Sequence, residues 1–333
     1  MRFRLLGKTG ISVSAVSFGA GPVSGLLTST DRQRQQAVVS RAVAAGVNWF
    51  DTAATYGDGQ SEARLGEALA DLATDHPVHL ATKVRVRLTT ETDLRPLVVD
   101  SVKASLTRLR RSSVTLLQVH NSITTRRNDQ PTSITPEDLL GPRGLLAGME
   151  EVRAAGWVEH FGLTGIGDAS ALTTVLESGR FDTIQAPLHL LNPSALRATP
   201  SAFCDPDYGG FLRHADRLGM GIFAIRVYAA GALVGAEPSA HTMKTPFFPL
   251  DLYRRDLRRA ESLARRLGGS ASLAQAALRY VLSLPEVTSA IIGFGAIEQV
   301  DEAVRISQLE PLSPGQVSAL EAERNASVED PPS

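Results

Sequence analysis

Short apolar runs recur along the chain and alternate with longer segments in which apolar residues repeat at helical spacing. Eight runs rich in β-branched and apolar residues are predicted strands: residues 13–18, 47–50, 78–82, 114–119, 160–164, 183–186, 221–225 and 287–292. Amphipathic helices are predicted between them, for example over residues 32–45, 62–72, 94–109, 136–155 and 170–176. Because near-continuous apolar strands joined by helical crossovers form parallel sheets, these eight units predict an α/β fold, the (β/α)8 TIM barrel.

Two segments depart from this alternation. The N-terminal residues predict a short β-hairpin that turns at residues 7–10 and could plug the bottom of the barrel. Between the seventh and eighth strands, a loop near residues 241–249 precedes two helical patterns, which predict an extra helical segment. Gly268 can end the first helix, and Ser272 with Gln275 resembles a capping box that starts the second.

The composition is that of an ordinary globular protein. The chain has 333 residues, of which 43% are hydrophobic and 21% charged. The length permits two domains, but no Pro-, Gly- or Ser-rich linker divides the chain. We therefore expect one barrel domain over residues 1–325 and a disordered tail over residues 326–333.

Charge and cysteine content narrow the function classes. The net charge is -1 and no dense Lys/Arg block is present, so neither a nucleic acid nor an anionic membrane is an expected partner. The single Cys204 can form neither an internal disulfide nor a cysteine-cluster metal site. The N-terminus lacks the apolar core of a signal peptide, and no apolar run reaches the ~18 residues of a membrane span. We expect a cytoplasmic protein with small-molecule partners.

Polar side chains stand where several apolar strands end. The second strand ends at Asp51, with Tyr56 on the loop that follows; the third ends at Lys83, and the fourth at His120. In a barrel these ends meet on the C-terminal rim, where chemistry is found. A buried Asp or Lys is costly unless it is paired, so Asp51 and Lys83 are expected to neutralise each other.

The lysine is informative because the chain uses only four lysines against 30 arginines. A compact ammonium is therefore favoured at this strand end. An ammonium stabilises a neighbouring phenolate, so Tyr56 would release its proton more readily and could act as a general acid. His120 could then position a carbonyl oxygen by hydrogen bonding.

Three segments resemble the aldo-keto reductase family: FDTAATYGDGQSEARLGEAL at residues 50–69, ATK at 81–83 and LLQVHN at 116–121. The resemblance extends over almost the whole chain. It implies NAD(P)-dependent carbonyl reduction or the reverse alcohol oxidation, with Tyr56 as proton donor, Asp51 and Lys83 tuning it, and His120 orienting the substrate. It also implies that a barrel, rather than a Rossmann domain, holds the cofactor.

The resemblance further implies cofactor positions, which match less evenly. Gln185 corresponds to the glutamine that binds the nicotinamide carboxamide, whereas the family's Ser-Asn pair falls on Thr164 and Gly165 and its stacking aromatic on Ile225. Arg226 could contact either the diphosphate or the substrate. The full set of implied cofactor-binding residues is Gly19, Ala20, Asp51, Thr164, Gly165, Gln185, Ile225, Arg226, Val227, Tyr228, Ala229, Gly231, Gly293, Phe294, Gly295, Gln299 and Glu302.

The residues after the last predicted strand bear on the choice between NADP and NAD. A glycine-containing turn there leads into a helix N-terminus, which is a suitable anion cradle. The family's basic and hydroxyl partners of the adenosine 2′-phosphate fall on Gly293, Phe294 and Gln299, so only weak NADP preference is expected. Backbone amides or Arg305 could compensate, and Glu302 resembles the adenine-side glutamate.

Other functions remain open from the sequence. The barrel could be a cofactor-sensing regulatory subunit with little turnover, or an NAD-dependent sugar (aldose) dehydrogenase. A metal-dependent hydrolase using Asp51 and His120 is disfavoured because Lys83 would occupy the place of the cation, and no histidine shows metal-ligand spacing. The long loops 22–30, 121–136, 192–210 and 236–251 are the expected source of substrate specificity. The substrate, reaction direction and oligomeric state are not encoded in recognisable motifs.

Overall fold

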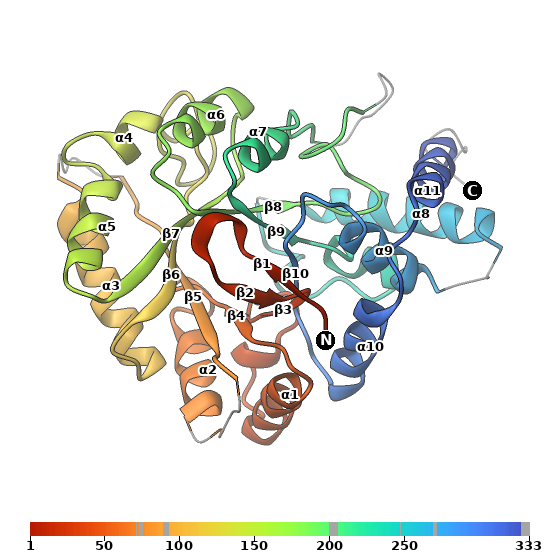
Figure 1. The fold of residues 1–333 in the computed structure, drawn as a ribbon, viewed down its shortest axis with the longest axis horizontal. Helices are drawn as coiled ribbons and strands as arrows, with labels where there is room; N and C mark the ends of the chain where they lie inside the picture. The colour runs from red at the N-terminus through yellow and green to blue at the C-terminus, as the bar shows by residue number, and fades with distance from the viewer. Residues whose placement is uncertain are drawn as a thin grey trace.

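The computed structural model describes residues 1–70, 72, 76–88, 93–199, 206–246, 248–268 and 272–327. Within these residues, eight parallel strands close into a barrel in the order β10-β3-β4-β5-β6-β7-β8-β9 (Figure 1). The strands are β3 (Val16–Gly19), β4 (Trp49–Asp51), β5 (His79–Val84), β6 (Val114–Val119), β7 (Val158–Thr164), β8 (Thr183–Pro187), β9 (Gly221–Ile225) and β10 (Ser289–Ile292). The closed parallel barrel confirms the predicted fold.

Helices surround the barrel (Figure 1). Apolar side chains fill the layer between helices and strands. The α-helices that the structure describes are α1 (Arg32–Ala44), α2 (Gln60–Ala70), α3 (Arg95–Leu109), α4 (Pro136–Leu140), α5 (Leu145–Ala154), α6 (Ala169–Glu177), α7 (Leu212–Arg217), α8 (Leu250–Arg266), α9 (Leu273–Leu282), α10 (Ile297–Gln308) and α11 (Pro314–Ala326). Short 3-10 segments are η1 (Gly7–Thr9), η2 (Leu26–Thr28) and η3 (Ala229–Val234).

The predicted N-terminal hairpin is present and covers the N-terminal end of the barrel. β1 (Phe3–Leu5) pairs antiparallel with β2 (Ser12–Ser14), and η1 connects them. Leu6 and Val13 pack in one buried cluster with the inward-facing Trp49, Leu116 and Phe223 of the barrel strands. This end is therefore closed by apolar side chains.

Two predicted elements were too long. The predicted helix over 136–155 is two helices, α4 and α5, because the Gly-Pro-Arg-Gly segment at 141–144 interrupts it and Gly144 has extended backbone angles. The predicted strand over 13–18 is likewise divided at Ala15, whose amide donates to the Arg2 carbonyl at 2.8 Å. Residues 12–14 consequently belong to the hairpin and only 16–19 to the barrel.

The extra helical segment before the last strand is α8, and α9 follows it. α9 begins as expected, with the Gln275 amide donating to Ser272 Oγ at 3.1 Å, although no reciprocal bond of a full capping box is present among the described residues. Of the residues predicted as a tail, Ala326 ends α11 and Ser327 caps that helix. Cys204, residues 328–333 and parts of loops 192–210 and 236–251 lie outside the described residues.

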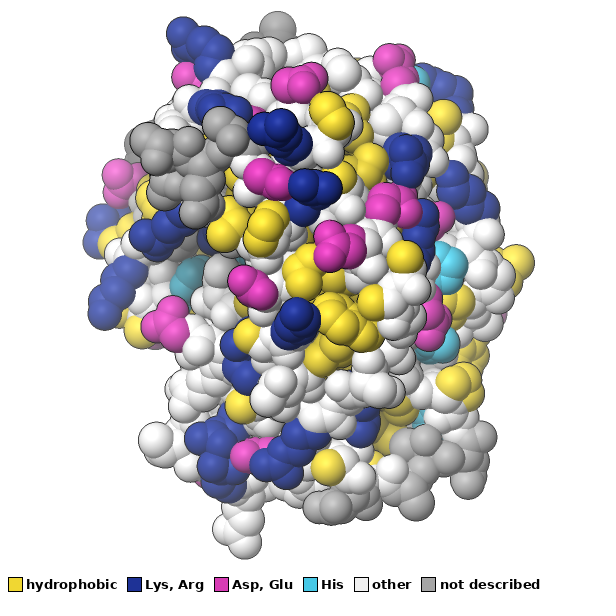
Figure 2. All heavy atoms as spheres, turned by 90° about the vertical axis from the view of Figure 1, so that its left-hand side faces the viewer, with side chains coloured by type: hydrophobic (Ala, Val, Ile, Leu, Met, Phe, Trp, Pro, Cys, Tyr) yellow, Lys and Arg dark blue, Asp and Glu magenta, His cyan; other side chains and the backbone are white. Residues whose placement is uncertain are grey.

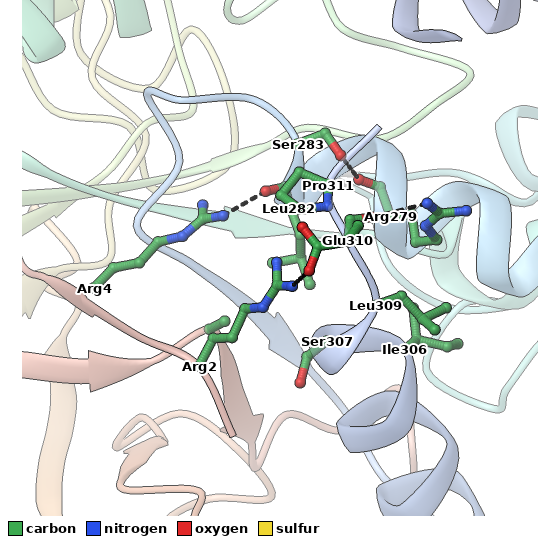
Figure 3. A pocket seen from close by; sticks show the side chains of 11 residues that line it. Arg2, Arg4, Arg279, Leu282, Ser283, Ile306, Ser307, Leu309, Glu310 and Pro311 are labelled. Atoms are coloured by element: carbon green, nitrogen blue, oxygen red, sulfur yellow. Dashed lines mark hydrogen bonds and ion pairs between the residues drawn. The ribbon is translucent and has the colours of Figure 1, made fainter. Parts of the chain in front are cut away.

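A cavity of only about 10 Å³ lies at the hairpin end, between the N-terminus and the ends of α9 and α10 (Figure 3). That volume holds about one water molecule. Arg4 donates there to the carbonyls of Leu282, the last residue of α9, and Val287, and Arg279 donates to the Glu310 carbonyl. These arginines satisfy backbone acceptors at helix ends, so the cavity is part of the packing and not a reaction site.

The face shown in Figure 2 carries Lys/Arg and Asp/Glu side chains interspersed with small hydrophobic patches. No broad area of one charge sign is visible on that face (Figure 2). Among the described residues, no helix combines the length and apolar character needed to cross a membrane.

Candidate active site

Asp51, Lys83 and Gln118 form a buried polar cluster at the C-terminal end of the barrel. Lys83 Nζ is ion-paired with Asp51 Oδ1 and donates to the Thr52 carbonyl at 2.8 Å. Gln118 Nε2 donates to the other Asp51 oxygen at 2.8 Å. The lysine and aspartate are 1% and 3% exposed, so both charges depend on these partners. The structure thus joins the two residues as the sequence predicted.

Electrostatics keep the Lys83 side chain charged. Burial alone would lower the pKa of Lys83, but the Asp51 carboxylate and Tyr56 raise it above its usual value. Burial raises the pKa of Asp51, while the Lys83 ammonium and the Gln118 amide act in the opposite direction. Lys83 is therefore a fixed ammonium at the base of the site.

Tyr56 lies on the loop between β4 and α2, above this ammonium. Its hydroxyl is 3.4 Å from Lys83 Nζ, and Nζ is 4.9 Å from the centre of the ring. The backbone of Ser61, in the first turn of α2, donates to the Tyr56 carbonyl at 3.2 Å, and Ser61 Oγ donates to the Ala20 carbonyl at 2.7 Å. The Tyr56 side chain is half-buried, so its hydroxyl can meet both the ammonium and a ligand.

His120 lies directly after β6 and contacts Tyr56. The two rings are 5.5 Å apart and meet edge to face at 85°. Its Nδ1 is 3.3 Å from Thr55 Oγ1. Burial, and then the cationic side chains of Arg85 and Lys83, hold the pKa of His120 well below its usual value. The imidazole is therefore neutral at neutral pH and can hydrogen-bond a carbonyl oxygen without carrying charge.

Two further residues support the cluster and were not assigned roles from the sequence. Gln118 lies in β6, two residues before His120, which directly follows that strand. Glu62 is fully buried and accepts bonds from Thr82 Oγ1 and from Arg108 Nε at 2.6 Å. It thereby fixes α2 against α3 and against the residue next to Lys83. The sequence did offer a signal for Gln118, since it is a polar residue inside an otherwise apolar strand.

Gln185 lies on β8 and Thr164 on β7, the two strands that follow β6 around the barrel. Gln185 Nε2 donates to Thr164 Oγ1 at 3.1 Å, whereas Gln185 Oε1 is buried without a hydrogen-bond partner among the described residues. A buried unpaired acceptor is costly and indicates a place for a donor from a ligand. At Gly165, an added Cβ would come within 2.6 Å of the Phe211 ring, so a larger residue would displace that ring.

The segment after β9 has a strained backbone. Arg226, Ala229 and Ala230 have positive φ angles of 58°, 49° and 58°, and Gly231 continues the turn at 106°. Val227 and Ala229 are buried, so their side chains face the core and only their backbone can meet a ligand. Ile225 is the half-buried last residue of the strand.

Tyr228 connects this segment to the one after β10. Burial raises the pKa of Tyr228, and the Glu302 carboxylate raises it further, which places the phenol within electrostatic reach of α10. The Gly295 amide donates to Gln299 Oε1 at 2.7 Å. β9 and β10 are neighbouring strands, so the segments that follow them lie side by side on the rim.

Three predicted cofactor positions, Gly19, Ala20 and Phe294, are closely packed. Phe294 is 1% exposed and its ring lies 5.6 Å from that of Phe18, in the core. A Cβ at Gly19 would approach Ile291 Cγ2 to 2.9 Å, and Ala20 is buried. At Phe294 and Ala20 the buried side chains leave the backbone groups as the ones available to a cofactor.

Arg34 was not predicted from the sequence as a residue of the site. This residue of α1 donates from Nε to the Gly295 carbonyl at 2.6 Å, and it is exposed. It therefore places a guanidinium at the glycine-containing turn where the sequence lacks a basic residue. A separation of 261 residues left no local signal for this contact. Arg305, the cation suggested from the sequence, is an exposed residue of α10.

Nothing in the described part of the chain groups three or more His, Cys, Asp or Glu residues as metal ligands. The Lys83 ammonium contacts Asp51 where a metal-dependent hydrolase would hold its cation. This contact argues against the hydrolase alternative.

Comparison with known proteins gives a consistent picture. The family model described as "Aldo/keto reductase family" matches residues 15–324. L-galactose dehydrogenase from Arabidopsis thaliana is 26% identical over 331 residues, covering 97% of this chain and 93% of that protein. A probable voltage-gated potassium channel subunit beta from Oryza sativa subsp. japonica is 26% identical over 349 residues, covering 97% and 96%.

Among solved structures, the holo form of aldo-keto reductase AKR11C1 from Bacillus halodurans superposes with a TM-score of 0.72. It is 20% identical, and the alignment covers 97% of this chain and 96% of that one. At that identity the likeness supports the barrel fold alone.

Proposed function

The chain belongs to the aldo/keto reductase family, and on this premise we propose that it transfers hydride between NADP or NAD and the carbonyl carbon of an aldehyde, ketone or sugar. The observation that carries the proposal is the rim cluster: Tyr56 hydroxyl beside the Lys83 ammonium, with the neutral His120 ring against Tyr56. This set can protonate and orient a carbonyl oxygen at one point.

A nicotinamide cofactor fits the described residues. The buried Gln185 Oε1 needs a donor, and a carboxamide NH2 group is such a donor. Gln185 and Thr164 would hold the carboxamide, the segment from Arg226 to Gly231 would lie along the diphosphate, and Gly293 to Glu302 would lie near the adenosine. When bound, the reduced cofactor supplies the hydride.

The chain's own residues then manage the proton. Tyr56 donates its hydroxyl proton to the oxygen of the former carbonyl, and the Lys83 ammonium stabilises the phenolate that remains. Asp51 keeps Lys83 charged and in place, and His120 donates a hydrogen bond that orients the same oxygen. In the alcohol-oxidising direction Tyr56 takes the proton back.

We propose that the protein discriminates only weakly between NADP and NAD. Gly293, Phe294 and Gln299 offer no cationic side chain to a 2′-phosphate, but the exposed Arg34 guanidinium lies at the same turn. Either cofactor is therefore expected to be usable, with a modest advantage to NADPH through Arg34.

A regulatory subunit is the second candidate, because one relative carries the name of a probable channel subunit beta. An aldose dehydrogenase is the finer alternative within catalysis, since another relative carries the name L-galactose dehydrogenase. A cytoplasmic location and the expectation of no nucleic-acid or membrane partner stay predictions from the sequence.

The test is steady-state oxidation of NADPH and NADH with a panel of aldehydes, ketones and sugars, and the reverse reaction with the matching alcohols. Turnover that Tyr56→Phe lowers supports the enzyme. Tight cofactor binding without turnover in either direction would support the regulatory subunit instead.

A further inference from the structure

Gln118 is a buried amide inside the barrel, next to the ion pair of the site. It lies in β6, in register with Lys83 of β5 on one side and with Gly162 of β7 on the other. Residues in register on neighbouring strands project to the same face of a sheet. Lys83 and Gln118 accordingly reach the same carboxylate, that of Asp51.

The Gln118 side chain occupies space that a glycine leaves on the next strand. A Cβ at Gly162 would come within 3.0 Å of Gln118 Cγ and within 2.5 Å of Thr183 Oγ1. Contacts this short would force a neighbouring side chain to move. Gly162 therefore gives the glutamine room to lie along the inside of the barrel.

Asp51 decides which way the Gln118 amide points. Nε2 donates to Asp51 Oδ2 at 2.8 Å, and a carboxylate only accepts hydrogen bonds, so the nitrogen must face it. Oε1 consequently points elsewhere, and it is buried without a hydrogen-bond partner among the described residues. An unpaired buried acceptor costs stability, so an apolar residue would suit packing better. The bond to Asp51 is what Gln118 adds at this position.

That bond acts on Tyr56 through Lys83. An ammonium has three N–H donors, and Lys83 Nζ is ion-paired with Asp51 Oδ1. Its other two acceptors are the Thr52 carbonyl at 2.8 Å and the Tyr56 hydroxyl at 3.4 Å. Both oxygens of Asp51 therefore have a donor, the ammonium at Oδ1 and the amide at Oδ2. The amide fixes the rotation of the carboxylate, and the carboxylate fixes Nζ beside the phenol.

We infer that Gln118 is a positioning residue of the proposed reaction, acting through Asp51 to hold the Lys83 ammonium beside the reacting phenol. The inference rests on the proposed function and adds a residue to its machinery. The phenolate that the ammonium stabilises forms only as the proton moves, so the interaction is stronger in the transition state than in the substrate complex. Loss of the amide donor should therefore lower kcat and leave KM nearly unchanged.

The first variant is Gln118→Met, which keeps an unbranched side chain and removes the donor. With para-nitrobenzaldehyde and the better of the two reduced cofactors, kcat should fall by about tenfold or more, the effect of losing a hydrogen bond to a charged group. KM and the Kd of the cofactor should change by less than about threefold. A wild-type kcat, or a loss confined to KM, would overturn the inference while leaving the proposed function intact.

Gln118→Glu separates the donor from the shape of the side chain, because its carboxyl group can donate to Asp51 only while it is protonated. The other titratable groups of the cluster are the same in both proteins: Asp51, Lys83, Tyr56 and His120. The ratio of the variant's kcat to that of the wild type therefore reports the new carboxyl group. This ratio should be highest at acidic pH and should decrease as pH rises, because the ionised carboxyl repels Asp51.

Circular dichroism at each pH checks that both proteins are folded. If the kcat of Gln118→Glu never exceeds that of Gln118→Met at any pH, the donor is not what matters and the inference is overturned.

A matched control removes a buried amide at the hairpin end of the barrel. Asn48 is 4% exposed, donates to the Ser12 carbonyl at 2.8 Å and accepts from the Ser14 amide at 2.8 Å. Asn48→Leu should destabilise the fold but keep the wild-type kcat below its unfolding temperature. If it lowered kcat as much as Gln118→Met does, the effect would be a general loss of packing, and the inference would be overturned.

Urea unfolding separates the inference from the proposed function. If no carbonyl compound turns over in the wild type, the proposed function fails. The single variants Gln118→Met and Asp51→Asn and the double variant still measure whether Gln118 supports Asp51. The double variant should lose less stability than the sum of the single losses, because each single variant already removes the hydrogen bond to the charged carboxylate. Additive losses would overturn the inference.

Discussion

The two ends of the barrel use similar residue types for different purposes. At the hairpin end, Leu6 and Val13 pack against Trp49 and Phe223, and Arg4 is satisfied by backbone carbonyls. At the other end, polar groups are buried with incomplete partners, as the unpaired Oε1 of Gln185 shows. Apolar packing stabilises the first end, whereas the second end keeps hydrogen-bonding groups that the chain itself does not satisfy.

The backbone shows the same contrast. The rim segment after β9 holds three non-glycine residues, Arg226, Ala229 and Ala230, at positive φ. Such conformations are costly and persist where surrounding structure imposes them, often at ligand sites. Polar residues thus stabilise the fold where the chain itself satisfies their hydrogen bonds, and they are available to a ligand where it does not.

The largest expected effect is that of Lys83→Met. This substitution removes the cation beside Tyr56 and leaves Asp51 buried without its ion pair. We expect turnover to fall by about 10²-fold or more and unfolding free energy to fall by about 3–5 kcal/mol. Steady-state kinetics and urea unfolding measure the two effects.

The double variant Lys83→Met with Asp51→Asn is the control for this prediction. It removes both charges, so it should be more stable than Lys83→Met alone while remaining as inactive. If the single variant proved as stable as the wild type, Asp51 would not depend on Lys83 for its charge.

Leu6→Ala tests the other end of the barrel. Leu6 is 1% exposed within the plug, and the truncation should cost about 2–5 kcal/mol of unfolding free energy. KM and kcat below the unfolding temperature should stay near the wild-type values, because the plug is remote from Tyr56. A large change in KM at a temperature where the variant is fully folded would show that the two ends of the barrel are coupled.

Arg34→Ala tests cofactor choice at the rim. We expect the ratio of kcat/KM for NADPH over NADH to fall by up to about tenfold, which corresponds to ~1.4 kcal/mol. The exposed Arg32, in the same helix and paired with Glu67, provides the matched control as Arg32→Ala. A preference for NADPH of about a thousandfold in the wild type, unaffected by Arg34→Ala, would point to another phosphate-binding cation, with Arg305 as the next variant.

The smallest effect concerns pH and His189. Its folded-state pKa is lowered, so below pH ~6.5 the unfolded chain binds a proton that the folded chain does not. Stability therefore decreases as pH falls below that value, by up to about 1.4 kcal/mol per pH unit for one such group. His189→Gln should lose less stability between neutral and mildly acidic pH than the wild type, as urea titrations at each pH measure. A parallel loss in both proteins would contradict a neutral His189.

The fold and the cluster of Asp51, Lys83 and His120 on the rim were largely predictable because their signals are local. Each barrel strand is a short apolar run, and Asp51, Lys83 and His120 stand at the ends of three neighbouring runs. The break between α4 and α5 was signalled by the Gly-Pro-Arg-Gly segment, but the apolar periodicity on both sides outweighed it in the prediction.

Long-range contacts account for what the sequence could not supply. Arg34 meets Gly295 although 261 residues separate them in the sequence. Phe294 is a second case, because its position between two glycines does not reveal that its ring packs against Phe18. Side-chain direction in such turns depends on tertiary packing.

The most direct test is a single turnover with reduced cofactor deuterated at its transferable position. With a neutral aldehyde such as para-nitrobenzaldehyde, the wild-type protein is predicted to place deuterium on the carbon of the product alcohol. Tyr56→Phe is expected to retain cofactor binding and to transfer deuterium about 10²-fold more slowly or worse. Bound cofactor without any deuterium transfer in the wild type, or transfer at the wild-type rate in Tyr56→Phe, would contradict the account.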